Sequence, residues 1–211
     1  VRWSLDDFMR WVSSDQARTR YKFLLEQYEV STTNIPKSTQ QMIYYPTNKI
    51  RVPVNKQNVL KSGVVKPEDV DLIVDYIDID LPTSGLYKNR LMMLDILHNN
   101  DWERPIYFSI TIGNSAHSYA YLWDYFQLDG LAYRLVPIKT KSQAGKIGRI
   151  ESDILYTSLM ERFEYGNMNS PEVYLDETNL RLVMNIRNNF SRLADKLILE
   201  GDSAAAIKVL D

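Results

Sequence analysis

Asp78 and Asp80 are the residues whose types and spacing best suit chemistry. They are separated by one residue near the end of a run rich in β-branched side chains, residues 72–81. Because alternate residues of a strand point to the same face, the two carboxylates should lie side by side. Such a pair suits a divalent cation that holds a nucleotide-sugar diphosphate, but hard cations need about six oxygens and no further ligands are recognisable. We therefore predict that an arginine, with Arg104 as the candidate, neutralises the pair, and we assign no metal and no cofactor.

Ser115 and His117 form a second candidate site, on the loop after the strand predicted over residues 105–112. In open α/β sheets, ligands bind beyond the carboxyl ends of the strands, where this loop would lie. However, a hydroxyl and an imidazole on one loop are not a catalytic triad, and neither a nucleophile elbow nor a phosphate-binding glycine pattern is present. No catalytic residue is therefore assigned. The other histidine, His98, extends the apolar stripe of a helix and is predicted to be packed and hydrogen-bonded.

Aromatic residues gather in the segment that follows this loop. Tyr119, Tyr121 and Trp123 alternate along a stretch that is predicted to be helical over residues 118–128. One face of a helix cannot bury all of them, so some should be exposed. Exposed aromatic rings can contact sugars or peptides, and core packing is the alternative. These three residues are therefore candidates for a binding surface.

The hydrophobic pattern predicts an α/β fold as the scaffold for these side chains. Strands are expected over residues 72–81, 105–112 and 131–138, with helices over residues 87–99 and 118–128 between them. Strands that alternate with helices through short connections predict a mostly parallel sheet flanked by helices.

The first residues predict a capped helix. Ser4, followed by Asp7 three positions later, resembles a capping box. Four apolar residues then fall on one helical face: Leu5, Phe8, Met9 and Val12.

The C-terminal part is predicted to be a helical hairpin. Residues 176–199 repeat apolar side chains at helical spacing, and residues 203–210 follow a turn at Gly201. Four apolar residues of the longer helix should face inward: Leu180, Val183, Phe190 and Leu193. Such a hairpin resembles the start of a tetratricopeptide array, which needs a further repeat to bury its apolar face. We therefore divide the chain into an α/β domain over residues 1–166 and a helical segment over residues 167–211 that we expect to be truncated.

Composition excludes several classes of protein. The 211 residues carry a net charge of −2 without a basic block, which argues against a nucleic-acid-binding protein. The absence of cysteine removes disulfides, thiol nucleophiles and thiolate metal sites. No apolar run approaches the roughly 20 residues that a membrane-spanning helix needs.

Four blocks of the sequence carry a resemblance to one protein family. They are residues 3–8, 76–82, 100–109 and 124–137, in the order in which the family has them. The family consists of many-spanning membrane proteins of Bacteroidetes that are similar to protein O-mannosyltransferases. The chain resembles their C-terminal soluble part over nearly its whole length.

The resemblance implies a function for the parent protein more than for this part of it. Such transferases carry their catalytic acid on loops between membrane helices, so we expect this chain to be a non-catalytic accessory domain. The partners implied are the membrane-embedded N-terminal half of the same polypeptide and an acceptor protein or glycan. The location implied is the periplasmic face of the inner membrane.

The alternative is a free-standing α/β enzyme whose site includes Asp78, Asp80, Ser115 and His117. Hydrophobic spans upstream of Val1 would favour the accessory domain, whereas a signal peptide or a start codon there would favour the enzyme.

Overall fold

A computed structural model describes two compact units. The residues that it describes are 1–14, 47–81, 86–110, 122–141, 146–168 and 170–211. The described residues up to Arg104 form the first unit, and those from Pro105 onward form the second. Each unit contains a three-stranded sheet of its own.

The first unit begins with a capped helix. A strand of two residues, β1 (Trp3–Ser4), leads directly into α1 (Leu5–Ser13). The Ser4 hydroxyl accepts a hydrogen bond from the backbone N–H of Asp7 at 3.0 Å and donates to the Asp7 carboxylate at 2.6 Å. The predicted cap is therefore present. The predicted apolar face is buried: Leu5, Phe8, Met9 and Val12.

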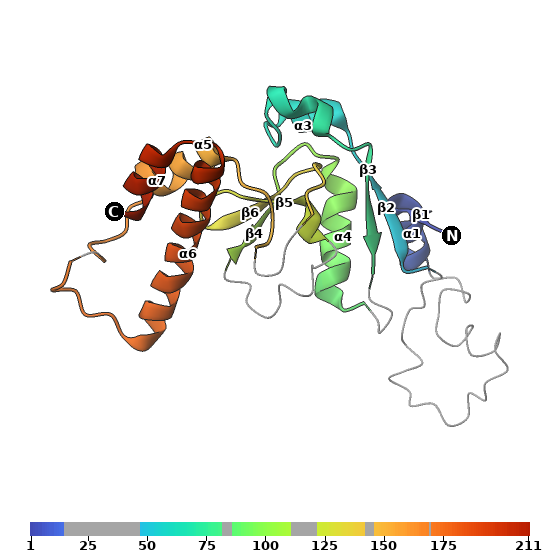
Figure 1. The fold of residues 1–211 in the computed structure, drawn as a ribbon. Helices are drawn as coiled ribbons and strands as arrows, with labels where there is room; N and C mark the ends of the chain where they lie inside the picture. Colours follow the sequence, from blue (N-terminus) through green and yellow to red (C-terminus); the bar gives the residue numbers. More distant parts are fainter. Residues whose placement is uncertain (15–46, 82–85, 111–121, 142–145, 169) are drawn as a thin grey trace. The chain divides into compact units, whose positions relative to one another are not determined.

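The sheet of the first unit has the order β1-β2-β3 (Figure 1). β1 pairs parallel with β2 (Lys49–Pro53), and β2 pairs antiparallel with β3 (Tyr76–Asp80). Side chains alternate between the two faces of a strand, so one face of this sheet is apolar and the other is polar. The buried residues of β2 and β3 are Ile50, Val52, Ile77 and Ile79.

Three helical segments complete the described part of the first unit. They are α3 (Lys56–Lys61), the 3-10 helix η3 (Pro67–Leu72) and α4 (Lys88–Asn100). The last of these confirms the helix predicted over residues 87–99. Its buried residues are Met93, Leu94 and Leu97.

A left-handed turn after α4 joins this helix to the rest of the unit. Asp101 and Trp102 both have positive φ angles, 39° and 62°. The Asp101 carboxylate accepts hydrogen bonds from the side-chain amides of Asn55 at 2.8 Å and Asn58 at 3.1 Å. The indole of Trp102 is 6% exposed, and its N–H donates to the carbonyl of Pro53 at 3.0 Å. Because non-glycine residues rarely adopt this conformation, these contacts must hold it in place.

The second unit contains an antiparallel sheet with the order β4-β6-β5. Its strands are β4 (Tyr107–Ser109), β5 (Phe126–Leu128) and β6 (Ala132–Leu135). A tight turn joins β5 to β6, in which Gly130 has a φ of 85° and the Asp129 N–H donates to the carbonyl of Ala132 at 2.9 Å. Gly130 also lies against the ring of Phe163, so that a side chain there would collide with it. Glycine is therefore needed at this turn for conformation and for space.

The predicted parallel sheet is wrong. β3 belongs to the sheet of the first unit, whereas β4 and β6 are antiparallel neighbours in the second. The helix predicted over residues 118–128 would have supplied a crossover, but its last three residues form β5. Because β5 returns to β6 through a turn rather than a helix, the pairing must be antiparallel. A short apolar run does not distinguish a strand from a buried helix, and this ambiguity caused the error.

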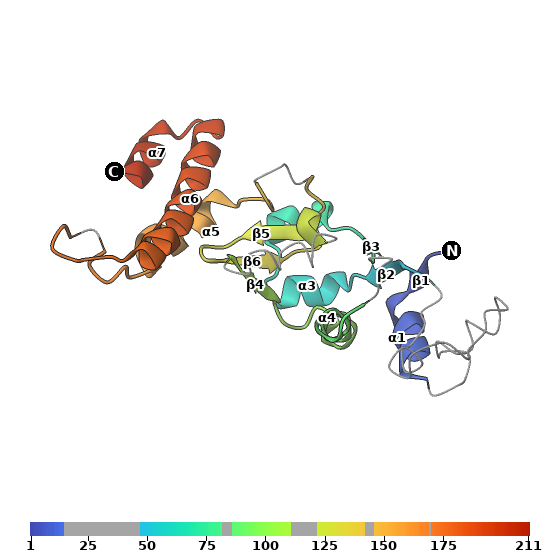
Figure 2. The same ribbon diagram turned by 90° about the horizontal axis from the view of Figure 1, so that it is seen from below.

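Helices make up the rest of the second unit. They are α5 (Ser152–Tyr156), the π-helix η5 (Thr157–Arg162), α6 (Glu177–Leu199) and α7 (Ser203–Leu210). α6 and α7 lie side by side and run in opposite directions (Figures 1 and 2). They share one core with β5, α5 and η5, composed of Leu128, Leu155, Leu159, Leu193, Ala194, Leu197, Ala206 and Val209.

The predicted helical hairpin is confirmed in its bounds and only partly in its packing. Leu193 is buried, but Leu180 is 50% exposed, because the N-terminal turns of α6 contribute no residue to the core. Apolar side chains also remain exposed at Leu199, Ile207 and Leu210. The likeness to a tetratricopeptide array stays a prediction, since one hairpin does not show a repeat. None of the helices in the described ranges combines the length and the apolar character needed to cross a membrane.

Candidate functional site

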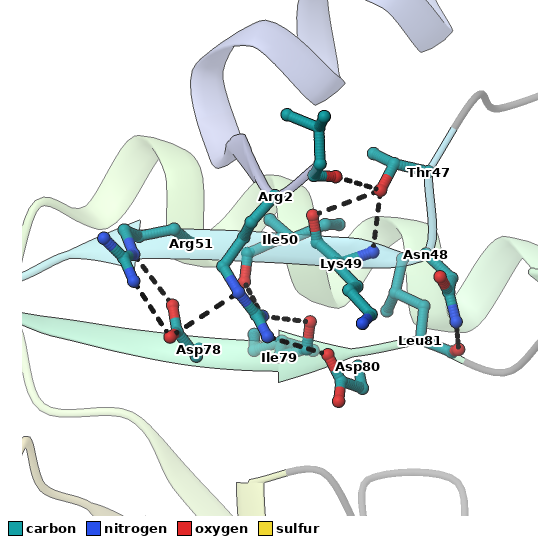
Figure 3. Close-up of polar contacts among 11 residues, drawn as sticks. Arg2, Thr47, Asn48, Lys49, Ile50, Arg51, Asp78, Ile79, Asp80 and Leu81 are labelled. Atoms are coloured by element: carbon teal, nitrogen blue, oxygen red, sulfur yellow. Dashed lines mark hydrogen bonds and ion pairs between the residues drawn. The ribbon is translucent and has the colours of Figure 1, made fainter.

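Asp78 lies on the exposed, polar face of the first sheet and is paired with Arg51. The antiparallel register makes these residues direct partners on β3 and β2. Arg51 donates from Nε to Oδ1 of Asp78 at 2.8 Å and from Nη2 to Oδ2 at 3.0 Å (Figure 3). This is the two-pronged geometry in which a guanidinium best matches a carboxylate. The hydrogen bond to Asp78 also raises the pKa of Arg51 above its ordinary value.

Arg2 joins the second carboxylate to this pair. Its Nη2 donates to Oδ1 of Asp80 at 3.1 Å, and its Nε lies 3.5 Å from Oδ2 of Asp78. Its Nη1 donates to the backbone carbonyls of Ile50 at 3.1 Å and Ile79 at 3.2 Å (Figure 3). Arg2 therefore reaches from the start of β1 over β2 to β3 and ties the three strands together.

Tyr76 extends the cluster along the same face. The guanidinium carbon of Arg51 lies 3.5 Å from the centroid of the Tyr76 ring, within the range of a cation–π contact. The ring is 42% exposed. Arg2, Arg51, Tyr76, Asp78 and Asp80 are called the β2–β3 face below.

The arginines that pair with Asp78 and Asp80 in the structure differ from the predicted one. The arginines that contact Asp78 and Asp80 are Arg2 and Arg51, whereas Arg104 is exposed after α4 and its carbonyl accepts a hydrogen bond from the Asn100 amide at 2.8 Å. The pairing of β2 with β3 could have identified Arg51, but the sequence does not specify that register. A dication between the two carboxylates would meet two guanidinium groups. Within the described ranges, no three histidine, aspartate or glutamate side chains gather as a metal site would require.

The remaining predicted site residues lie either outside the described residues or in the second unit. Ser115, His117, Tyr119 and Tyr121 lie outside the described residues. Trp123 is half-buried just before β5 in the second unit. The enzyme-site role of Ser115 and His117, and the sugar or peptide contacts of Tyr119, Tyr121 and Trp123, therefore stay predictions.

His98 is hydrogen-bonded, as predicted. Its Nε2 lies 3.1 Å from Oδ1 of Asp6, which joins α4 to α1. Arg10 contacts the carboxylates of Asp6 at 2.6 Å and Asp7 at 2.7 Å. The hydrogen bond with His98 is the main cause that lowers the pKa of Asp6 below its ordinary value, and Arg10 adds to it.

Acid is expected to remove the stabilisation that Asp6 provides. Because the pKa of Asp6 is lowered in the folded state, its carboxylate stabilises the fold above the unfolded value of about 3.9, and this contribution is lost as the pH falls through the lowered pKa. Asp6→Asn and His98→Gln should each flatten the decrease in melting temperature between about pH 5 and about pH 2. Circular dichroism melts at constant ionic strength measure this decrease. An Asp6→Asn protein that loses stability in acid as steeply as the unaltered chain would contradict the assignment.

The second unit contains a buried polar cluster that was not predicted from the sequence. Nε of Arg134 lies 2.8 Å from Oδ2 of Asp129, and both side chains are at most 10% exposed. Gln127 donates to Oδ1 of Asp129 at 2.9 Å. Burial raises the pKa of Asp129, although Arg134 and then Gln127 act in the opposite direction. Arg134, a charged residue within the otherwise mostly apolar strand β6, was the signal in the sequence that could have indicated this cluster, because buried charges need partners.

Two polar residues of α6 extend this buried cluster. The Asn189 amide donates to the carbonyl of Gly130 at 2.9 Å. Arg192 donates to the carbonyls of Ile147 at 2.7 Å and Gly148 at 3.2 Å. Both α6 side chains are buried. Asn189 and Arg192 thus donate hydrogen bonds to backbone carbonyls of two loops. The cluster therefore holds α6 to the sheet, and we assign it a structural role.

The β2–β3 face is therefore the best-supported candidate site. It presents fixed donors and acceptors at the surface, an arrangement that suits binding rather than proton transfer. No curated protein and no solved structure matches the chain. The family model described as TMEM260-associated domain 2 matches residues 1–154, which include the whole β2–β3 face. The chain therefore belongs to the TMEM260-associated domain 2 family.

Proposed function

We propose that the chain is a non-catalytic accessory domain of a TMEM260-like membrane protein. The observation that carries this proposal is the family match over residues 1–154, because TMEM260 is a protein O-mannosyltransferase-like membrane protein. A domain associated with such a protein needs no catalytic group of its own. Its role is to contact the acceptor protein, the glycan or partner segments.

The geometry of Asp78 and Asp80 supports a non-catalytic role. Glycosyl transfer needs a carboxyl group that can exchange a proton or hold a metal beside the sugar. Here Arg51 engages both oxygens of Asp78, and Arg2 engages Asp80. Oxygens that already accept hydrogen bonds from guanidinium groups are poorly placed to take a proton from an acceptor hydroxyl.

The expected position of the domain is part of the same proposal. We place it after the membrane spans of a Bacteroidetes polypeptide, at the periplasmic face of the inner membrane, where an O-mannosyltransferase-like protein would meet exported acceptors. Alkaline phosphatase and green fluorescent protein fused to the C-terminus of the parent protein report this position. Phosphatase activity without fluorescence is expected, and the opposite result would place the domain in the cytoplasm.

The isolated chain is expected to transfer no sugar and to bind no divalent cation tightly. The assay mixes the chain with a polyprenyl-phosphate-linked mannose donor and a serine- and threonine-rich peptide, and titration calorimetry measures the heats of Mn²⁺ and Mg²⁺ binding. Asp78→Asn should leave both results at background and lower the free energy of unfolding by at most about 1 kcal/mol, as is usual for exposed ion pairs. Glu177→Gln, which alters the exposed ion pair with Arg181 in α6, is the matched control.

Transfer or micromolar metal affinity that Asp78→Asn abolishes, while melting is unchanged, would overturn the accessory role. That result would favour a free-standing enzyme instead. Association supplies a positive test. Produced separately from the membrane spans of the parent protein, the chain should co-purify in detergent with those spans after crosslinking in cells, and failure to do so would also count against the proposal.

A further inference from the structure

We propose that the β2–β3 face binds a neutral sugar that is attached to an acceptor protein. This inference rests on the proposed function and names the ligand for it. The face lies within the first unit and within the family match, and its charged and aromatic side chains come from β2, β3 and the residue before β1. Its charge, its rigidity and its aromatic ring each point to this class of ligand.

The charges on the face compensate one another. Arg2 and Arg51 contribute two positive charges, and Asp78 and Asp80 contribute two negative ones. Lys49, which is opposite Asp80 in the register, adds one exposed cation at the margin. A face whose charges are paired does not attract an ion strongly, but its groups still form hydrogen bonds. The paired charges therefore favour a neutral ligand with many hydroxyl groups over the phosphate of a lipid-linked donor. The sugar on the acceptor protein is such a neutral ligand.

The hydrogen-bonding groups are held in place before a ligand arrives. The guanidinium of Arg51 is fixed by two bonds to Asp78, and that of Arg2 is fixed by two backbone carbonyls. A carboxylate oxygen can accept more than one hydrogen bond, so Asp80, whose side chain is 65% exposed, retains acceptor capacity while it holds Arg2. Side chains that are already ordered lose little entropy on binding, which favours weak, specific contact with hydroxyl groups.

Tyr76 supplies the apolar part of the surface. A pyranose ring has C–H groups that pack on aromatic rings, and tyrosine combines such a ring with a polar hydroxyl. Tyr76 is 42% exposed, and the Arg51 guanidinium lies over its ring at 3.5 Å from the centroid, so a pyranose would pack on the part of the ring that Arg51 does not cover. Stability alone gives little reason for this arrangement, because exposed ion pairs contribute only about 0–1 kcal/mol each.

Titration followed by nuclear magnetic resonance tests the inference. Methyl α-D-mannopyranoside added to the ¹⁵N-labelled chain should shift the amide signals of residues 49–53 and 76–80 and few others, with millimolar affinity. Tyr76→Ala and Asp80→Asn should each weaken binding about tenfold, which corresponds to about 1.4 kcal/mol. The spectra also show whether each variant is folded, and Asp80 is exposed enough for a neutral replacement to be tolerated.

Tyr87→Ala is the matched control. Tyr87 is an exposed tyrosine of the same unit with an arginine, Arg90, at 5.9 Å from its ring, but it is not part of the β2–β3 face. This variant should bind the mannoside as the unaltered chain does. Equal weakening by Tyr87→Ala, or no shifts in the unaltered chain, would overturn the inference.

α-D-Mannose 1-phosphate distinguishes the two sources of the sugar. It should bind no more tightly than the mannoside if the face serves a protein-linked sugar. Binding that is tenfold tighter and is lost in Lys49→Gln would overturn the acceptor-side assignment. Absence of mannoside binding together with co-purification of the membrane protein would remove this inference alone, whereas sugar transfer by the isolated chain would remove the accessory function itself.

Discussion

Replacing Trp102 by alanine is expected to lower the free energy of unfolding by about 3–5 kcal/mol. The indole is 6% exposed, and its removal leaves a large cavity where α4 ends. The carbonyl of Pro53 also loses the N–H that donates to it at 3.0 Å. Equilibrium unfolding in urea, followed by far-ultraviolet circular dichroism, measures the loss.

Trp102→Phe separates the two contributions to this loss. The phenyl ring retains much of the packing but has no N–H, so the expected loss is only about 1–2 kcal/mol, in line with an unsatisfied buried acceptor. Tyr87→Ala, which removes an aromatic side chain that is 74% exposed, should change stability by less than about 0.5 kcal/mol. A Trp102→Ala protein within about 1 kcal/mol of the unaltered chain would show that the indole does not hold this turn.

Asp129→Asn is expected to destabilise the second unit by about 3–5 kcal/mol. Asparagine retains an oxygen for Gln127 but removes the negative charge 2.8 Å from Arg134. The guanidinium, which is 10% exposed, is then left without its nearest counter-charge. Urea unfolding measures the loss, and hydrogen exchange of the amides in β5 and β6 shows whether it arises in this sheet.

The double variant Asp129→Asn/Arg134→Met provides the decisive comparison. Removing both charges of a buried pair is often neutral, because the desolvation cost of each ion disappears with it. The double variant should therefore recover most of the stability that Asp129→Asn loses, and end within about 1 kcal/mol of the unaltered chain. If Arg134→Met makes the Asp129→Asn protein still less stable, Arg134 is held by contacts other than this charge pair.

Local sequence was enough to predict α1, α4, α6 and α7. Ser4 caps α1, and Asp176 and Asp202 accept hydrogen bonds from the first turns of α6 and α7 in the same way. Caps and a repeat of 3.6 residues act within one or two turns, so neighbouring residues contain the information. The burial of each helix depends on what lies beside it. Leu180 has the right spacing and is exposed, because its turn of α6 extends beyond the core.

The choice of strand partners was decided by the tertiary structure. Strand character at residues 76–80 followed from alternation, but the same pattern is compatible with either direction of pairing and with any partner strand. Residues 126–128 show the limit most clearly, since they end a short, mostly apolar stretch that suits a helix or a buried strand. The tight turn at Gly130, and not the run itself, determines that this segment pairs antiparallel with β6.

One part of the candidate site was also predictable from the sequence, whereas the other part was decided by the tertiary structure. That Asp78 and Asp80 share one face follows from their spacing, because alternate residues of any strand point to the same side. Their arginines were not predictable, because Arg51 is brought opposite Asp78 by the register between β2 and β3, and Arg2 is brought over the sheet by the pairing of β1 with β2. Side-chain alternation is a property of the backbone of a single strand and is therefore present in the sequence. A pairing between distant segments depends on the packing of the whole unit, and only the tertiary structure contains it.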